Sequence, residues 1–567
     1  MLVKSPLEKG ASGWTGRLAI ALIAALAAGH SPDAAAQAAV GVAAQIAQAI
    51  PGGNSLPGRK SSDHGAAQGL RTVYARTANA PLWSHDGHAT PQAEGLLREL
   101  QNADAYGLRP EDYAAPAIAQ LLNAEGSSPG TDVRWAQFDV RLSAAAFAFM
   151  SDLHYGRVDP KAAGFNLQAP HEELDLAGAI EALTRSEDVG RQLAAVEPPF
   201  YHYRLLKDHL ALYLKLAQQP ALTQLPAAAA TVKPGNAYPG AAALRRLLIA
   251  LGDLPAASEV PSTDTTFDQE LSLGVQRFQQ RHGLAPDGAL GKATLKALTT
   301  PLAQRVRQID LTLERWRWLP LFETPPIIVN IPQFRLFAFR TTEDRAADIL
   351  QMDVIVGKIY PRTQTPVFES NMTYVVIRPY WDVPRSITVN EMLPKIRANP
   401  DYLAAQRLQI VSGQSDSSPA VAPTPDAIDA LAAGRLRLRQ LPGEDNALGL
   451  IKFMFPNNYS VYLHSTPAHR LFQESVRAFS HGCIRVSDPL ALASEVLKDA
   501  PGDWTREKIA AAMSGEKTIR VNLTQPINVL ILYGTALATE AGPILFFDDL
   551  YGYDRKLERQ LGLQPVR

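Results

Sequence analysis

Cysteine is almost absent from this sequence, because Cys483 is the only cysteine among 567 residues. A single thiol cannot form a disulfide within its own chain, so no disulfide framework can stabilise the fold. A structural zinc site is also disfavoured, since such sites need several cysteines or clustered histidines. Cys483 is therefore either a buried apolar side chain or a reactive thiol.

An excess of charge of one sign is also missing. The chain has 55 lysines and arginines against 56 aspartates and glutamates, and its formal net charge is −1. This balance argues against nucleic acid as a partner. The apolar run near the N-terminus, Leu18–Ala28, is eleven residues long, whereas a helix that spans a membrane needs about 20. No other segment has that length, so we expect a mature chain with no stable membrane span.

Residues 1–38 have the features of an export signal. Basic residues precede the apolar run, and an A-x-A cleavage site follows it at 34–36 or 36–38. The alternative is an uncleaved signal that remains as an anchor. An alanine-rich signal is typical of bacteria and predicts a periplasmic or cell-wall location. A free thiol is prone to oxidation there, so its presence favours a functional role.

The mature chain is long enough for three or four domains. Composition and hydrophobic periodicity predict a multidomain α+β protein. The expected segments are a signal peptide over 1–38, a flexible linker over 39–65, a helical scaffold over 66–235, a compact three-helix module over 236–300, a linking helix over 301–322, a β-rich catalytic domain over 323–540 and a C-terminal segment over 541–567.

The module over 236–300 contains apolar residues at helical spacing. These residues are Leu244, Leu247, Leu248 and Leu251 in one set and Phe267, Leu271, Val275 and Phe278 in another. The run 275–279 followed by 287–291 resembles the three-helix peptidoglycan-binding domain of bacterial wall enzymes. Such modules either bind the wall polymer or act as spacers, and the sequence leaves both roles open.

From residue 323 the apolar period changes to two, which predicts strands. The expected strands are 327–331, 335–339, 352–356, 374–377, 451–455, 461–463, 519–523 and 529–533. Between about 392 and 445 we expect the strands to stop and a helical insertion to cap the catalytic sheet. Its stretch Ser412–Pro425 is rich in Ser, Pro and Ala and is expected to be mobile. Long insertions beside active sites often act as lids.

Cys483 lies in the run Ser480-His481-Gly482-Cys483-Ile484-Arg485, and His464 lies nineteen residues upstream. Attack on a peptide carbonyl needs a thiolate, a base and hydrogen-bond donors for the oxyanion. A nearby imidazolium stabilises the thiolate. We predict Cys483 as nucleophile, His464 as general base and acid, and the N–H groups of Gly482 and Cys483 as oxyanion donors. The alternatives are an inert thiol and a structural histidine.

This arrangement resembles the signature of the L,D-transpeptidases, which have a β-rich YkuD-type catalytic domain. The matching residues are His464-Ser465, the run 480–485, the run 439–443 with Asn446, Leu448-Gly449, Lys452-Phe453, and the run 379–384. The scaffold, the wall-binding module and the capping insertion together resemble the large Gram-negative members. The resemblance covers about 66–555 and implies a periplasmic enzyme of the cell wall.

The resemblance also implies that a backbone carbonyl near Ser465 orients His464. Tyr462 is a candidate to supply a hydroxyl at the site, and Ser480 is a candidate supporting residue. His481 either takes part in the chemistry or only braces the loop. Arg485 either binds a substrate carboxylate or pairs with an acidic group such as Asp488. The role of Trp381 stays open, because this side chain is either a wall of the substrate cleft or part of the core. His469 is expected at the surface.

The sequence thus predicts an L,D-transpeptidase, and the resemblance implies its substrate. Cys483 would attack the bond between the L-centre of meso-diaminopimelate and the terminal D-Ala of a tetrapeptide stem. A neighbouring diaminopimelate amine would resolve the thioester and form a 3→3 cross-link, with no metal or organic cofactor. We also expect carbapenems to react with the thiol.

The acceptor of the acyl group stays open. Water would make the protein an L,D-carboxypeptidase, a lipoprotein lysine would make it a protein-to-wall ligase, and a free D-amino acid would make it an exchange enzyme. A non-catalytic wall-binding protein is the alternative from another class. Peptidoglycan synthases and endopeptidases are candidate partners.

Overall fold

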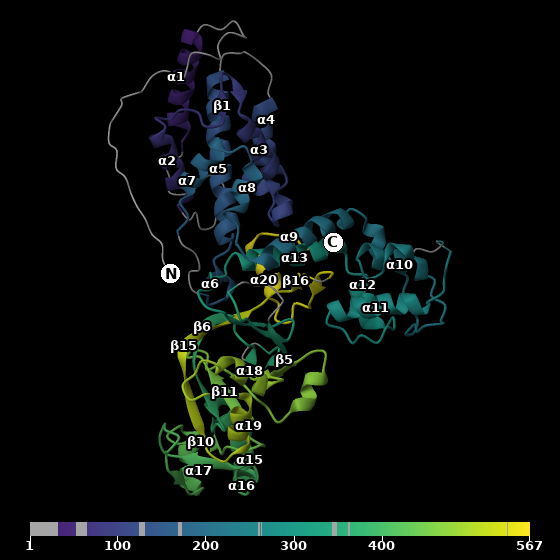
Figure 1. Cartoon of the computed structure of the whole chain (residues 1–567), viewed down its shortest axis with the longest axis vertical. Helices are drawn as coiled ribbons and strands as arrows, with labels where there is room; N and C mark the ends of the chain where they lie inside the picture. Colours follow the sequence, from purple (N-terminus) through teal and green to yellow (C-terminus); the bar gives the residue numbers. More distant parts are fainter. Residues whose placement is uncertain are drawn as a thin grey trace, which may run out of the picture.

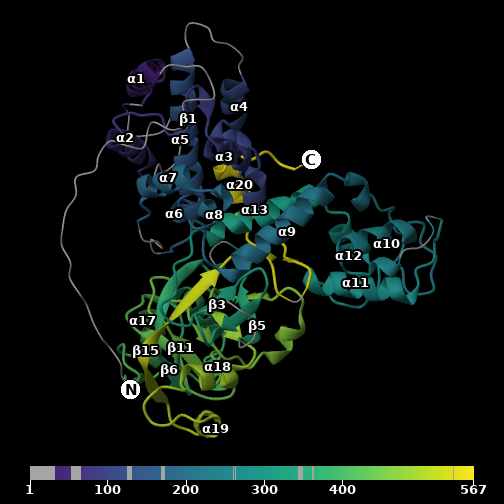
Figure 2. The same cartoon turned by 45° about the horizontal axis from the view of Figure 1, so that its top comes forward.

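The computed structural model describes residues 32–50, 52, 65–123, 131–167, 173–258, 261, 263–342, 349–360, 363–540 and 542–566. The molecule is elongated, with a helical bundle at one end and a small α/β cap at the other (Figure 1). A β-rich domain lies between them, and a three-helix module stands to one side in both views (Figures 1 and 2). The basic and apolar parts of the predicted signal lie outside the described residues.

The N-terminal bundle has one apolar core that is built around the long helix α5. Several of its helices begin where a side chain caps the free amides. Thr90, for example, accepts a hydrogen bond from the Ala93 N–H at the start of α3, where Pro91 occupies the first turn. The helices are α2 (Ala66–Arg76), α3 (Pro91–Gln101), α4 (Ala115–Asn123), α5 (Thr131–Tyr155), α6 (Pro160–Ala163), α7 (Leu176–Arg185) and α8 (Val189–Ala194).

The prediction of a flexible linker over 39–65 is wrong for residues 39–49. These residues belong to helix α1 (Pro32–Ala49), which packs against α5. Val42 and Ile46 of α1 are buried in the core of the bundle. Alanine favours the helix, and the burial of two apolar side chains fixes it to the bundle. Most of 51–64 lies outside the described residues.

The three-helix module consists of α10 (Ala241–Ala250), α11 (Gln269–Arg281) and α12 (Lys292–Leu298). Two contacts dock it on the C-terminal segment. The Arg281 guanidinium binds Asp253 of the module at 2.6 Å and donates to the Ile544 carbonyl at 3.2 Å. The His282 ring stacks on Phe546. The module therefore has a fixed side that packs on the rest of the chain.

Helix α13 (Leu302–Trp316) corresponds to the expected linking helix. It packs on α9 (Tyr201–Ala217) and on α20 (Tyr553–Gln560). Glu314 of α13 accepts hydrogen bonds from the backbone N–H groups of Arg157 and Val158, which follow α5. The helix thus joins the bundle, the module and the C-terminal segment.

The β-rich domain contains a nine-stranded sheet in the order β13-β5-β14-β12-β11-β6-β15-β3-β4, and an added β5–β4 pairing closes it into a barrel. Helices α18 (Pro489–Val496) and α19 (Arg506–Ser514) pack against its core. The strands expected at 519–523 and 529–533 are one irregular strand. The strands are β3 (Ile327–Asn330), β4 (Arg335–Ala338), β5 (Leu350–Gly357), β6 (Phe368–Ile377), β11 (Ile451–Met454), β12 (Leu463–His464), β13 (Ala478–Ser480), β14 (Ile484–Val486) and β15 (Ile519–Leu532).

The insertion, here called the cap (residues 381–446), differs from the prediction because strands do not stop in it. It contains a second sheet in the order β7-β10-β8-β9 and a small apolar core of its own. Within Ser412–Pro425, expected to be mobile, the Asp416 carbonyl accepts a hydrogen bond from Arg439 at 2.7 Å. The elements are β7 (Trp381–Asp382), α14 (Arg385–Ile387), α15 (Leu393–Ala398), α16 (Tyr402–Ala405), β8 (Leu408–Val411), β9 (Ala420–Val421), α17 (Pro425–Ala432) and β10 (Arg437–Gln440).

Within the part of the chain that the structure describes, no helix combines the length and the apolar character that crossing a bilayer requires.

Candidate active site

The predicted nucleophile and base lie on neighbouring parallel strands. In the register of β12 and β14, Leu463 is opposite Ile484 and His464 is opposite Arg485. Cys483, which directly precedes β14, is therefore beside Tyr462. Side chains alternate between the two faces of a strand. Leu463 and Ile484 are fully buried in the barrel core, so the other four side chains lie on the opposite face, here called the reactive face.

The loop that carries Cys483 is held by its own hydroxyl group and by a neighbouring loop. The Ser480 hydroxyl donates to the Cys483 carbonyl at 2.5 Å and accepts from the Gly482 N–H at 3.1 Å. Gly482 has φ +119°, a backbone conformation that other residues rarely adopt. The Thr365 hydroxyl donates to the Gly482 carbonyl at 2.7 Å and accepts from the Gly357 N–H. These bonds fix the position of the thiol.

The Cys483 thiol is partly exposed and has two polar neighbours. It donates to the Ser460 carbonyl, with 3.6 Å between Sγ and O. Ser460 has a left-handed φ of 56°, which is uncommon for a residue with a side chain. Burial raises the pKa of the thiol, and hydrogen bonds from the N–H and the hydroxyl of Tyr462 oppose that rise. Tyr462 therefore contacts the reacting sulfur.

His464 is buried, and its ring has a fixed orientation. Its Nδ1 lies 2.5 Å from the Ser465 carbonyl, the backbone oxygen that the family resemblance implied. This contact places the proton on Nδ1 and leaves Nε2 as the basic nitrogen. The centroid of the Tyr462 ring is 5.7 Å from that of the imidazole, so Tyr462, which contacts Cys483, also lies near His464. The ring orientation suits a general base.

The expectation that an imidazolium stabilises a thiolate is not met in the resting structure. Burial and the nearby Arg485 guanidinium lower the pKa of His464 to about 3. Burial also raises the pKa of the Cys483 thiol. Both shifts disfavour the charged forms, so the pair rests as a neutral thiol and a neutral imidazole.

One of the two predicted oxyanion donors is corrected by the structure. The Gly482 N–H is donated to the Ser480 hydroxyl and so is not free for a substrate oxygen. Among the described residues, none accepts a hydrogen bond from the Cys483 N–H. The Tyr462 hydroxyl, which contacts the sulfur, is a second candidate donor that sequence reasoning did not assign to this role.

Arg485 has no carboxylate partner in the described structure. Its Nε atom is buried without a hydrogen bond. Asp488, the predicted alternative partner, instead accepts from the Ala491 N–H and caps α18. The Arg485 charge adds to the lowering of the His464 pKa that burial causes, and it opposes the rise that burial causes in the pKa of Cys483. Arg485 was predicted either to bind a substrate carboxylate or to pair with an acidic side chain such as Asp488. The absence of such a pair among the described residues favours the first alternative.

The cap contacts the catalytic loop through His481. The His481 Nε2 atom lies 2.8 Å from the Glu391 carboxylate of the cap, and both side chains are exposed. This contact supports the bracing role for His481. Trp381 packs against the apolar core of the cap, which supports the core alternative for that residue. His469 is exposed, as expected.

The fold brings to this site several residues to which sequence reasoning gave no role in it. Lys452 of β11 lies opposite His464 in register. The Tyr551 hydroxyl accepts from the Thr365 N–H at 3.3 Å and donates to the Gly357 carbonyl at 2.6 Å, so the C-terminal segment supports the loop beneath Gly482. Lys452 belongs to a run that resembles the catalytic family, whereas the sequence neighbours of Thr365 and Tyr551 give no signal for the site.

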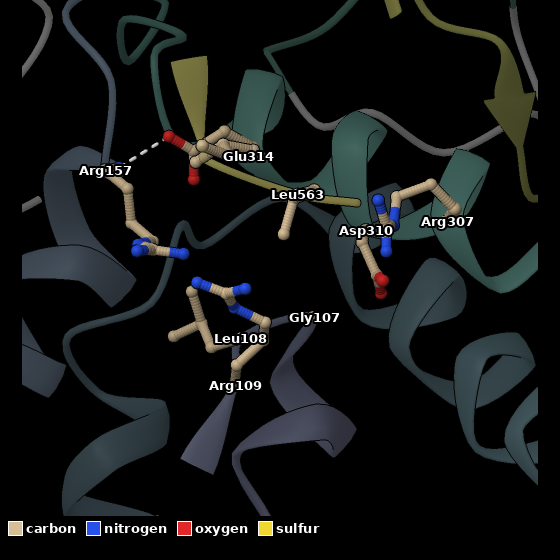
Figure 3. Close-up of a pocket in the computed structure, with 9 residues that line it drawn as sticks. Gly107, Leu108, Arg109, Arg157, Arg307, Asp310, Glu314 and Leu563 are labelled. Carbon is tan, nitrogen blue, oxygen red and sulfur yellow. Dashed lines mark hydrogen bonds between the residues drawn. The ribbon is translucent and has the colours of Figure 1, made fainter. Parts of the chain in front are cut away.

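An enclosed cavity of about 60 Å³ lies away from the reactive face. Figure 3 shows it between the loop after α3, helix α13 and the C-terminal segment, with Arg109, Arg307 and Asp310 around it. The site of Cys483 is instead the sheet surface beside the cap, so the two are separate. In the described ranges, no group of three or more His, Cys, Asp or Glu residues has the arrangement of a metal site.

Comparison with known proteins gives family matches for three ranges of the chain. Residues 68–210 match a family described as "Scaffold domain", 238–298 match "Putative peptidoglycan binding domain", and 325–508 match the L,D-transpeptidase catalytic domain. A Haemophilus influenzae protein named "Putative L,D-transpeptidase" is 33% identical over 279 residues. The match covers 48% of this chain and 54% of that relative.

The matches agree with the observed architecture of a helical bundle, a three-helix module and a β-rich domain, and they confirm the predicted fold class. Both Cys483 and His464 lie inside the region that matches the catalytic family. The chain therefore carries an L,D-transpeptidase catalytic domain of the YkuD family, preceded by a peptidoglycan-binding domain and a helical scaffold domain.

Proposed function

We propose that the protein is a periplasmic L,D-transpeptidase that forms 3→3 cross-links in peptidoglycan through a thioester on Cys483. The observation that carries the proposal is the placement of the thiol and the oriented imidazole on one face of adjacent strands. The catalytic-domain match and the relative's name support the reaction class. The peptidoglycan-binding match supports the polymer as substrate and a cell-wall location.

In the first step, Cys483 attacks the carbonyl carbon of the L-centre of diaminopimelate in a tetrapeptide stem. The thiol proton passes to Nε2 of His464 as the S–C bond forms. The Cys483 N–H and the Tyr462 hydroxyl are the donors for the tetrahedral oxyanion. The C–N bond then breaks, and the proton moves from His464 to the nitrogen of the departing D-Ala.

In the second step, an amine of a neighbouring diaminopimelate attacks the thioester carbonyl. His464 accepts a proton from the attacking amine, the C–S bond breaks, and the proton returns to the sulfur. Atoms and protons therefore balance over the cycle, and no external reagent is required. The buried, neutral imidazole can accept a proton in both steps because its free nitrogen is not already protonated.

Incubation with disaccharide-tetrapeptide, followed by mass spectrometry of protein and products, tests this proposal. We expect an acyl-enzyme that has lost one D-Ala, and a cross-linked dimer. Meropenem should also add its mass to Cys483, because a strained β-lactam carbonyl reacts with the same thiol. Cys483→Ala should acquire neither mass, and His464→Ala should slow acylation by about 10²–10⁴-fold.

The exposed His469 offers a matched control for the base. His469→Ala should acylate at the wild-type rate. Equal labelling of wild type and Cys483→Ala, or equal rates for His464→Ala and His469→Ala, would show that the reaction does not use this pair.

A further inference from the structure

Two cations flank the catalytic histidine across the sheet. In the strand registers, Lys452 of β11 lies opposite His464, and His464 lies opposite Arg485 of β14. The three side chains therefore form one row on the reactive face. Neighbouring strands are about 4.8 Å apart, so each cation is one strand from the imidazole. Both charges lower the pKa of His464.

Lys452 has no anionic partner at contact distance in the part of the chain that the structure describes. Burial lowers the pKa of its ammonium. The acidic groups that face it come from the cap, and these are Asp382 and Asp416. Asp382 is bound to Arg437 at 2.6 Å, and among the described residues neither carboxylate lies within ion-pair distance of Lys452. A partly buried charge without a partner is costly for the folded chain alone.

In both steps of the proposed transpeptidation, a nitrogen whose carbon also carries a carboxylate must come to the row formed by Lys452, His464 and Arg485. The departing D-Ala carries its nitrogen and its carboxylate on one carbon. The attacking nitrogen at the D-centre of diaminopimelate also shares its carbon with a carboxylate. In both steps the nitrogen must reach Nε2 of His464. The carboxylate then lies one carbon from that nitrogen, within reach of a cation beside the imidazole.

We propose that Lys452 binds the carboxylate on the carbon that carries the leaving or attacking nitrogen, and so selects α-amino carboxylates as acyl acceptors. This inference rests on the proposed function and deepens it by naming the acceptor class. Arg485 lies on the same strand as the nucleophile, whereas Lys452 lies on the far side of His464. Lys452 is therefore placed to hold the acceptor and not the acyl group.

The proposal separates acceptors that the sequence left open. The D-centre of diaminopimelate and a free D-amino acid both carry the required carboxylate. Water has none, and the side-chain amine of a lipoprotein lysine is attached to a carbon without one. A charge-assisted hydrogen bond to the carboxylate favours the first two acceptors.

The test compares two acceptors that differ only in that carboxylate. Wild-type protein is acylated with the tetrapeptide and offered D-methionine or D-methioninamide, and mass spectrometry gives the rate of each exchanged product. We expect wild type to favour D-methionine. In Lys452→Met the ratio of the two rates should fall by about tenfold or more, while Lys452→Arg keeps most of it. Each variant uses the same two amines, so their intrinsic reactivity cancels.

Arg520 provides a matched control, because it continues the same row on β15 and its guanidinium lies over the Tyr374 ring. Arg520→Met should keep the wild-type ratio. The proposal is overturned if Lys452→Met keeps the wild-type ratio, if Arg520→Met loses it equally, or if wild type shows no preference. A wild-type protein that forms no thioester would instead overturn the proposed function, and this inference with it.

Discussion

Cys483 and His464 share surroundings that disfavour charge on both side chains. Burial is the main cause of each pKa shift, and Arg485 adds to the shift of the histidine while opposing that of the thiol. The site thus differs from a preformed thiolate–imidazolium pair, in which the sulfur is reactive at neutral pH. The raised pKa of the thiol favours its protonated form.

This resting state predicts the pH dependence of thiol alkylation. Because the thiol pKa is raised, the rate with iodoacetamide should keep rising between about pH 6 and pH 9 and show no plateau near neutrality. Arg485→Met removes the cation that lowers the thiol pKa, so its alkylation should be slower at the same pH. Peptide mapping of Cys483 measures both rates. A neutral plateau in wild type would mean that the thiolate is already formed.

At the scale of elements, the cysteine loop depends on the loop that follows β5. The Thr365 hydroxyl connects the Gly357 N–H to the Gly482 carbonyl. Tyr551 of the C-terminal segment supports the same loop through the Thr365 N–H. Residues from three distant parts of the sequence therefore position one turn, and the turn positions the nucleophile.

Thr365→Val should show how much this bridge contributes. The change keeps the shape of the side chain but leaves the buried Gly357 N–H and the buried Gly482 carbonyl without that partner. Each unsatisfied group typically costs about 1–3 kcal/mol of folding free energy. We expect a lower unfolding midpoint in urea and slower acylation by meropenem. Thr363→Val is the control, because its hydroxyl contacts only the Tyr360 carbonyl in the exposed part of that loop. Equal effects of the two changes would contradict the bridge.

At the scale of the whole molecule, buried ionic contacts join domains that lie far apart in the sequence. Asp554 of α20 binds Arg315 of α13 at 2.6 Å and accepts from the Thr535 hydroxyl at 2.7 Å. All three lie in the interior. The C-terminal segment therefore connects the linking helix to the end of the barrel.

Asp554→Ala should destabilise this junction strongly. Removing one partner leaves the buried Arg315 charge uncompensated, which typically costs about 3–5 kcal/mol. We expect a lower thermal unfolding midpoint for the transition that includes α13 and α20. The double variant Arg315→Met with Asp554→Leu should regain most of the loss, since it removes both charges and keeps apolar packing. A single variant with wild-type stability would show that the pair does not hold the junction.

Much of this architecture could be predicted from the chain itself. Periodicity located most strands of the barrel and the helices of the module, because side-chain alternation is a local property. It did not locate β13 and β14, the short strands on either side of the cysteine loop, because each is only three residues long. Two predictions about the fold also failed for physical reasons. The alanine-rich stretch after residue 38 became helix α1 once Ile46 found a core, and the cap gained strands that pair only across its own fold.

The sequence by itself determined which reactive groups are available. These are the thiol of Cys483, the imidazole of His464 nineteen residues before it, and Gly482, where the backbone must turn. Only the tertiary structure decided which atoms meet. Strand register set Lys452 and Arg485 on either side of His464, and the Ser480 hydroxyl occupied the Gly482 N–H. Register and hydrogen-bond competition join residues that are distant along the chain, so no local pattern of residues encodes them.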